Sequence, residues 1–450
     1  MQMATISRWT LAFFGCALVA LLLALLLLTS GYGYPNAAVA APETLIVVHL
    51  IMIGWLSLLM LGALLQFLPV LVGRELALPR LAPMMLAAIV SGLALLLAGF
   101  GGLSGWSGAN ADLMPLGGSI ILAGFVLGAI SLFATLLSAK SLPLPAGFVA
   151  VALMSALVAV LMGDTLAAAL AGLVGGDFSI ALVTHGVSLH AGFGLGGWLT
   201  LAAVGVSYRL LAMFMIAPER KGLWPQIAFG AAVLALAMLC GVLGVLLVSS
   251  TSWALGLGVA GAAALAALAA YLADITALYR SRRRRALELH MVAAIGAFAM
   301  LGLGAALLFW AVIGNSEAGA AAAVYLLGLG WLSGLGLAML YKIIAFLTWL
   351  ECFAPLMGRT PTPRVQDLVR ENHARHWFAL YFAATLLGGA AILLSAPALL
   401  QGAAALQLAA VLLLAHQLIR ARRLADLPEP WRNHPRPRLL MPTPRQRSFP

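Results

Sequence analysis

The stretch Glu43–Val72, ETLIVVHLIMIGWLSLLMLGALLQFLPVLV, is an apolar span with one ionisable side chain in its interior, His49. Its phrase Gly-Trp-Leu-Ser at 54–57 returns as Gly-Trp-Leu-Thr at 197–200 and as Gly-Trp-Leu-Ser at 330–333. The three tryptophans lie 143 and 133 residues apart along the chain. Self-similarity at this period predicts three copies of one multi-helix unit. The alternative is chance recurrence in Leu- and Gly-rich helices, and matches at the flanking positions argue against it.

The composition places the chain in a membrane. Of its 450 residues, 63% are hydrophobic and 9% are charged, and the mean hydropathy is +1.06. These values exclude an ordinary soluble domain and predict an all-α polytopic membrane protein. The three cysteines are far apart in sequence and predict neither a disulfide framework nor a zinc site. The first apolar run, residues 10–29, is expected to be an uncleaved helix rather than a signal peptide.

The apolar runs predict twelve transmembrane helices, each long enough to cross about 30 Å of hydrocarbon. The expected spans are 9–30, 44–72, 81–102, 113–138, 146–170, 181–213, 224–249, 253–278, 287–313, 318–351, 377–397 and 402–420. Grouped by fours, they give a transmembrane domain over 1–423 with pseudo-threefold repeats at about 1–140, 141–280 and 281–423.

The charges fix the expected orientation. Under the twelve-helix prediction, the loops on one side contain no Lys or Arg, and all 25 basic residues fall on the other side. The positive-inside rule then predicts a bacterial inner-membrane protein with both termini in the cytoplasm. The net charge of +11 therefore indicates topology and contact with anionic membrane lipid, and it does not indicate nucleic acid. The Pro- and Arg-rich segment 424–450 is expected to be an extended cytoplasmic tail without a core.

Ionisable side chains inside a bilayer are expensive, so each one is a candidate functional residue. His49 in the second span and His185 and His190 in the sixth lie in the outer third of the membrane. Two neutral imidazoles at matching depth suit the axial coordination of a low-spin haem. His290, beside Glu288 near the inner face, cannot share that site. The alternative for each histidine is a hydrogen bond to a neighbouring helix.

The two histidines of the sixth span do not share a helix face, because five residues correspond to roughly 140° around a helix. One of His185 and His190 is expected to bind while the other points elsewhere. The predicted ligands of haem b iron are therefore His49 with His190 or His185, and the spare histidine is a candidate copper ligand. Arg209 and Lys342, both eleven residues after a repeated tryptophan, are expected to be cations that reach the inner interface.

The chain contains three sequence motifs, H-L-x-x-x-G-W from His49, H-A-x-x-x-x-x-G-W from His190, and V-S-Y-R-L-L-A-M-F at 206–214. They resemble those of the haem–copper oxidase catalytic-subunit (subunit I-like) superfamily. The motifs are also similar to those of a set of small oxidase-like or nitric-oxide-response membrane proteins. The resemblance covers most of 1–420 and implies twelve helices in three four-helix arcs, with the second, sixth and tenth at the centre. It also implies that His49 is the low-spin haem ligand of the second helix.

The departures from that family are serious. The sixth span lacks His-Pro-Glu-x-Tyr, the seventh lacks a His-His pair, and the tenth lacks histidine, with Tyr325 at the level of His49. A copper centre and a high-spin haem of the oxidase type are therefore not expected. The sequence predicts a haem-binding protein for electron transfer or for haem, copper or nitric-oxide handling, with a cytochrome c or other redox subunit as partner. If it is an enzyme, it is oxidoreductase-like without oxygen reduction. The alternatives are a secondary transporter, which also suits twelve helices, and a structural subunit of a membrane complex.

Overall fold

The computed structural model describes residues 9–218, 222–248, 254–429 and 431–441. This part of the chain is helical and contains no β-strand, which confirms the all-α expectation. Within it, twelve helical spans are long and apolar enough to cross a membrane. The predicted number of spans is therefore confirmed.

Nine of the described spans are single α-helices. They are α1 (Thr10–Thr29), α4 (Leu81–Leu103), α5 (Leu113–Leu137), α6 (Leu144–Leu170), α10 (Leu223–Val248), α11 (Ala254–Arg280), α12 (Leu289–Ile313), α15 (Glu371–Leu393) and α16 (Pro397–Arg422).

The second, sixth and tenth spans are interrupted by π-helical stretches. The second consists of α2 (Pro42–His49), η1 (Leu50–Ser57) and α3 (Leu58–Val72). The sixth consists of α7 (Gly176–Ala181), η2 (Leu182–Gly186), α8 (Val187–Ala191), η3 (Gly192–Thr200) and α9 (Leu201–Met215). The tenth consists of α13 (Glu317–Tyr325), η4 (Leu326–Ser333) and α14 (Gly334–Cys352).

Each repeated Gly-Trp-Leu-Ser/Thr phrase lies at the end of a π-helical stretch, and its hydroxyl closes the wider turn. Ser57 donates to the carbonyl of Met52 at 2.8 Å, Thr200 to that of Leu195 at 2.7 Å, and Ser333 to that of Gly328 at 2.7 Å. Each acceptor lies five residues before its donor, which matches the i→i+5 spacing of a π turn. The three phrases therefore share one local structure, whereas the pseudo-threefold arrangement of whole repeats stays a prediction.

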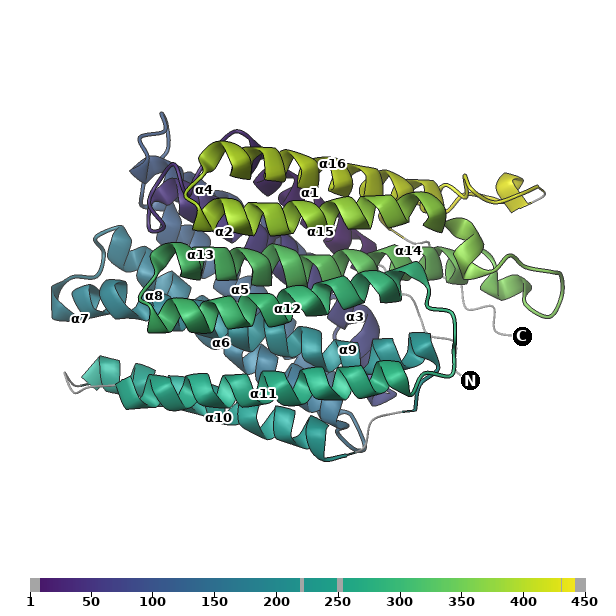
Figure 1. Cartoon of the computed structure of the whole chain (residues 1–450), viewed down its shortest axis with the longest axis horizontal. Helices are drawn as coiled ribbons and strands as arrows, with labels where there is room; N and C mark the ends of the chain where they lie inside the picture. The colour runs from purple at the N-terminus through teal and green to yellow at the C-terminus, as the bar shows by residue number, and fades with distance from the viewer. Residues whose placement is uncertain (1–8, 219–221, 249–253, 430, 442–450) are drawn as a thin grey trace. The chain divides into compact units, whose positions relative to one another are not determined.

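The chain forms two compact units, residues 1–51 with 288–450 (unit 1) and residues 52–287 (unit 2). In unit 1, α15 packs on α16, α1 packs on α16, and α12 packs along α13 and α14 (Figure 1). In unit 2, α4 pairs with α5 and α10 pairs with α11, and α6 lies between α5 and α9 (Figure 1). Leucine and alanine account for most of the buried hydrophobic side chains.

Several helix ends differ from the sequence expectation. The sixth span begins at Gly176 rather than at residue 181, because α7 extends it through polar residues that hydropathy assigns to a loop. The eleventh begins at Glu371 rather than at residue 377, since the amphipathic turn 371–376 continues into the apolar helix. The loop before the last span accordingly lies at 394–396 rather than at 398–401.

The segment after α16 packs against the end of α14, so the expectation of a tail that buries no core is wrong for Leu424, Leu427 and Trp431. Leu424 and Leu427 are fully buried in a cluster with Phe353. The ring of Trp431 packs edge-on against Phe353 with 5.8 Å between centroids. The Pro- and Arg-rich composition does not predict this packing, because a few apolar side chains spaced between prolines are enough to cover a helix end. The remainder of the predicted tail, 442–450, lies outside the described residues.

Candidate functional site

His190 is held against α6 by a hydrogen bond to the main chain. Its Nδ1 lies 2.8 Å from the carbonyl oxygen of Ala159. A carbonyl only accepts hydrogen bonds, so in the neutral ring Nδ1 carries the proton and Nε2 carries the lone pair. Metal-binding histidines commonly have this arrangement, because a backbone carbonyl on one nitrogen orients the other toward the metal.

A glycine in α6 makes room for this imidazole. A Cβ at Gly163 would lie only 2.9 Å from His190 Cε1. The absence of a side chain there lets the ring lie flat on α6 within reach of Ala159. The next residue, Asp164, accepts hydrogen bonds from Ser119 Oγ at 3.2 and 3.3 Å. The position of His190 is therefore set by the packing of α6 and α8 in unit 2.

His185 has different surroundings from His190. It lies in η2 and is exposed. His190 is half-buried against α6. The two side chains thus differ in environment, as their spacing around the helix leads one to expect.

His49, in unit 1, has the same ring tautomer as His190. It is the last residue of α2, and its Nδ1 lies 2.7 Å from the carbonyl oxygen of Leu45, one turn earlier. Nε2 therefore carries the lone pair in the neutral ring. η1 begins at the next residue, Leu50, and π-helical insertions occur often at functional sites.

The third repeat places a tyrosine where the first has its histidine. Tyr325 directly precedes η4, and its hydroxyl donates to Gln407 Oε1 at 2.6 Å. Gln407 Nε2 in turn donates to Thr385 Oγ1 at 2.8 Å, and both side chains are completely buried. These hydrogen bonds hold the Tyr325 side chain in the interior of unit 1. A second buried hydroxyl, that of Tyr381, donates to the carbonyl of Leu329 within η4 at 2.7 Å.

The charged residues near the other end of these helices form ion pairs. Lys342 Nζ lies 2.5 Å from Glu288 Oε2, and His290 Nδ1 lies 3.5 Å from the same oxygen. His290 is therefore part of an ion-paired group with Glu288 and Lys342. The sequence predicted Lys342 as a cation that reaches the inner interface but did not reveal this pairing, because Glu288 is 54 residues away.

Among the described residues, no three His, Cys, Asp or Glu side chains lie close enough together to hold a metal ion. A haem iron needs only one or two axial protein ligands, so single histidines in suitable tautomers remain the relevant feature. Comparison of the chain with protein-family models and with curated proteins found no match.

Proposed function

We propose that the chain is a haem-binding integral membrane protein in which His49 and His190 are axial ligands of a haem b iron. Its role is electron transfer, or the handling of haem or nitric oxide, rather than oxygen reduction. A bound haem would supply one-electron exchange at its iron. The distribution of basic residues supports a bacterial inner membrane with both termini in the cytoplasm, and a cytochrome c or other redox subunit is the expected partner.

The observation that supports the proposal is that the imidazole rings of His49 and His190 have the same tautomer. Both histidines direct Nδ1 to a backbone carbonyl, at 2.7 and 2.8 Å, and both precede a π-helical stretch of a repeat. In each case the chain's own carbonyl holds the proton on Nδ1 and gives Nε2 the role of ligand. His185 is exposed in η2 whereas His190 is half-buried against α6, which favours His190 as the ligand of the sixth span.

Oxygen reduction is not part of the proposal because the tenth span offers no histidine. Tyr325 occupies that place and is hydrogen-bonded to Gln407. In the tenth span this position is thus part of a packed polar network, which supports a structural role for Tyr325 rather than one in metal coordination.

The test is to purify the full chain in detergent after expression with added haem precursor. We expect a reduced-minus-oxidised spectrum of a b-type cytochrome and a pyridine haemochrome that gives a haem-to-chain ratio. His49→Ala should lower that ratio strongly, and His416→Ala, in α16, is the matched control and should not. A folded wild-type chain without a haem spectrum would contradict the proposal and favour the transporter alternative.

A further inference from the structure

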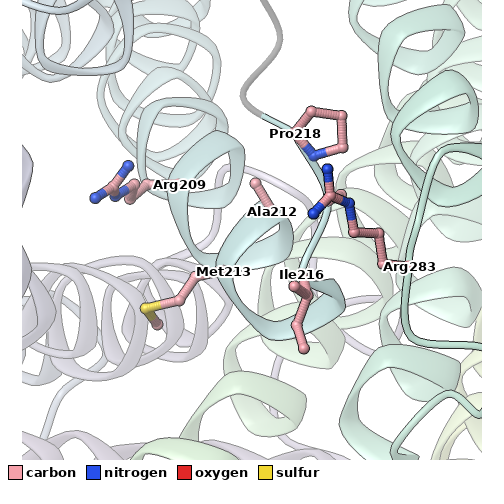
Figure 2. Close-up of a pocket in the computed structure, with 7 residues that line it drawn as sticks. Arg209, Ala212, Met213, Ile216, Pro218 and Arg283 are labelled. Atoms are coloured by element: carbon pink, nitrogen blue, oxygen red, sulfur yellow. The ribbon is translucent and has the colours of Figure 1, made fainter.

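Unit 2 contains a pocket of about 390 Å³ where α9 ends. Its lining includes two arginines, one from α9 and one from the loop after α11, together with apolar side chains. Figure 2 shows Arg209 and Met213 on one side of the helix end, and Arg283 beside Pro218 on the other. The volume lies within the range of about 300–1,000 Å³ that is usual for small-ligand sites.

The pocket is shaped by the way α9 terminates. Ile216 has a left-handed backbone, with φ of 51°, which turns the chain sharply after Met215 and leaves the Ile216 side chain exposed. The arginine-rich loop is fixed to the same helix end, because the amide of Arg284 donates to the carbonyl of Met215 at 3.3 Å. Arg283, the preceding residue, is thereby held at the pocket.

The electrostatics of the pocket favour an anion. Among the described residues that line it are two with guanidinium groups, and none with a carboxylate. The C-terminus of α9 contributes a partial negative charge of about half a unit, which two full positive charges outweigh. Guanidinium groups also match the geometry of phosphate oxygens, with which they form paired hydrogen bonds.

The apolar side chains beside the arginines indicate which class of anion the pocket would bind. Met213 and Ile216 are exposed, at 44% and 59%, next to the arginines. The site lies at the end of a helix long and apolar enough to span a membrane, where an acyl chain would cover such side chains. A soluble phosphate would leave them exposed to water. Basic pockets between transmembrane helices are known binding sites for lipid headgroups.

We propose that this pocket binds one anionic phospholipid, with its phosphate at Arg283 and an acyl chain along Met213 and Ile216, while Arg209 adds a second positive charge to the pocket lining. The site is independent of haem binding, since it uses only residues at the end of α9 and in the loop after α11. Such a site would keep one phospholipid molecule bound at a fixed position on unit 2.

The experiment is native mass spectrometry of the full chain, titrated with phosphatidylglycerol and, separately, with phosphatidylcholine. We expect tighter binding of phosphatidylglycerol and about fivefold weaker binding in Arg283→Gln, the change expected for one basic side chain near an anionic lipid. Arg285→Gln is the matched control, because Arg285 is exposed in the same loop and does not line the pocket. Arg209→Gln should weaken binding similarly.

Three outcomes would overturn the proposal. One is unchanged phosphatidylglycerol binding in Arg283→Gln, and another is an equal loss in Arg285→Gln. The third is displacement of the lipid by excess inorganic phosphate, because that would show a site that recognises phosphate alone. A circular dichroism spectrum like that of the wild type checks that each variant is folded.

Discussion

The indole Nε1 of Trp198 donates a hydrogen bond to Ser57 Oγ at 2.9 Å, within unit 2. The two residues belong to the repeated phrases of the sixth and second spans and lie 141 residues apart in sequence. Both side chains are buried. Because the same Ser57 hydroxyl donates to Met52, it both closes the π turn of η1 and accepts the neighbouring indole.

Replacing Ser57 with alanine should therefore destabilise the fold. The change removes the acceptor of a buried indole N–H, and an unsatisfied buried donor costs about 1–3 kcal/mol. We expect a clear decrease in the thermal unfolding midpoint in detergent. Ser91→Ala is the control, because the Ser91 hydroxyl is exposed and bonds only within its own helix, to Ala87. Equal midpoints for the two variants would show that the Trp198–Ser57 bond contributes little.

Gly163→Ala should weaken haem binding without unfolding the chain. The added methyl would lie 2.9 Å from His190 Cε1, so the ring must shift away from its hydrogen bond to Ala159. Disturbing the partner that orients a metal-binding histidine typically costs about 10–100-fold in affinity. Titration of the haem-free protein with haem measures the effect. In the control, Gly147→Ala on the same helix, the methyl would meet Phe229 at an ordinary 3.5 Å. Unchanged affinity in Gly163→Ala would argue against His190 as a ligand.

Tyr325→Phe should cost stability and leave haem content unchanged. The variant removes the donor to Gln407 Oε1, a completely buried amide oxygen. The loss is expected to be about 1–3 kcal/mol, seen as a lower unfolding midpoint. The haem-to-chain ratio of the same preparation gives the second readout. A loss of haem from a folded variant would place Tyr325 in the cofactor site, contrary to the account above.

Stability should depend on pH through Asp426, beyond the end of α16. Burial raises the pKa of its carboxyl, but hydrogen bonds from Arg420 and Gln417 and the charges of Arg420 and Arg370 lower it to a net value below the ordinary 3.8. A depressed folded-state pKa means that the stabilisation is complete above about pH 4 and is lost as the pH falls further.

The corresponding variant is Asp426→Asn. At neutral pH it should be less stable by about 1–2 kcal/mol, an amount discounted because both arginines are partly exposed. Between pH 5 and 3, roughly, the unfolding midpoint of the wild type should fall more steeply than that of the variant. Parallel curves would show that this carboxylate has no part in acid destabilisation. Asp112→Asn, in an exposed turn, is the control.

Much of the fold was predictable, because long apolar runs and the placement of basic residues depend on local composition. The spans around His49 and Trp331 were located to within a few residues, as hydropathy allows. The π-helical stretches were not predicted, since an apolar pattern does not distinguish i→i+4 from i→i+5 turns. The repeated hydroxyl after Gly-Trp-Leu was the available signal, and its role becomes visible only in the bonds made by Ser57 and Ser333.

The site was predictable in residue type and less so in its supporting contacts. Sequence could name His190 and place it in a span, but the choice between His190 and His185 required packing. Ala159 and Gly163 have no chemical signature of their own, and they support His190 only because α6 lies against α8. Likewise, the packing of Leu427 on Phe353 depends on the path of the chain after α16, which a Pro- and Arg-rich composition conceals.

The most direct test of the central claim is the electron paramagnetic resonance spectrum of the oxidised, haem-loaded protein. We predict a low-spin ferric signal of bis-imidazole type in the wild type and in His185→Ala, and its loss in His190→Ala. A signal that persists in His190→Ala, or that disappears in His185→Ala instead, would contradict the assignment of His190 as an iron ligand.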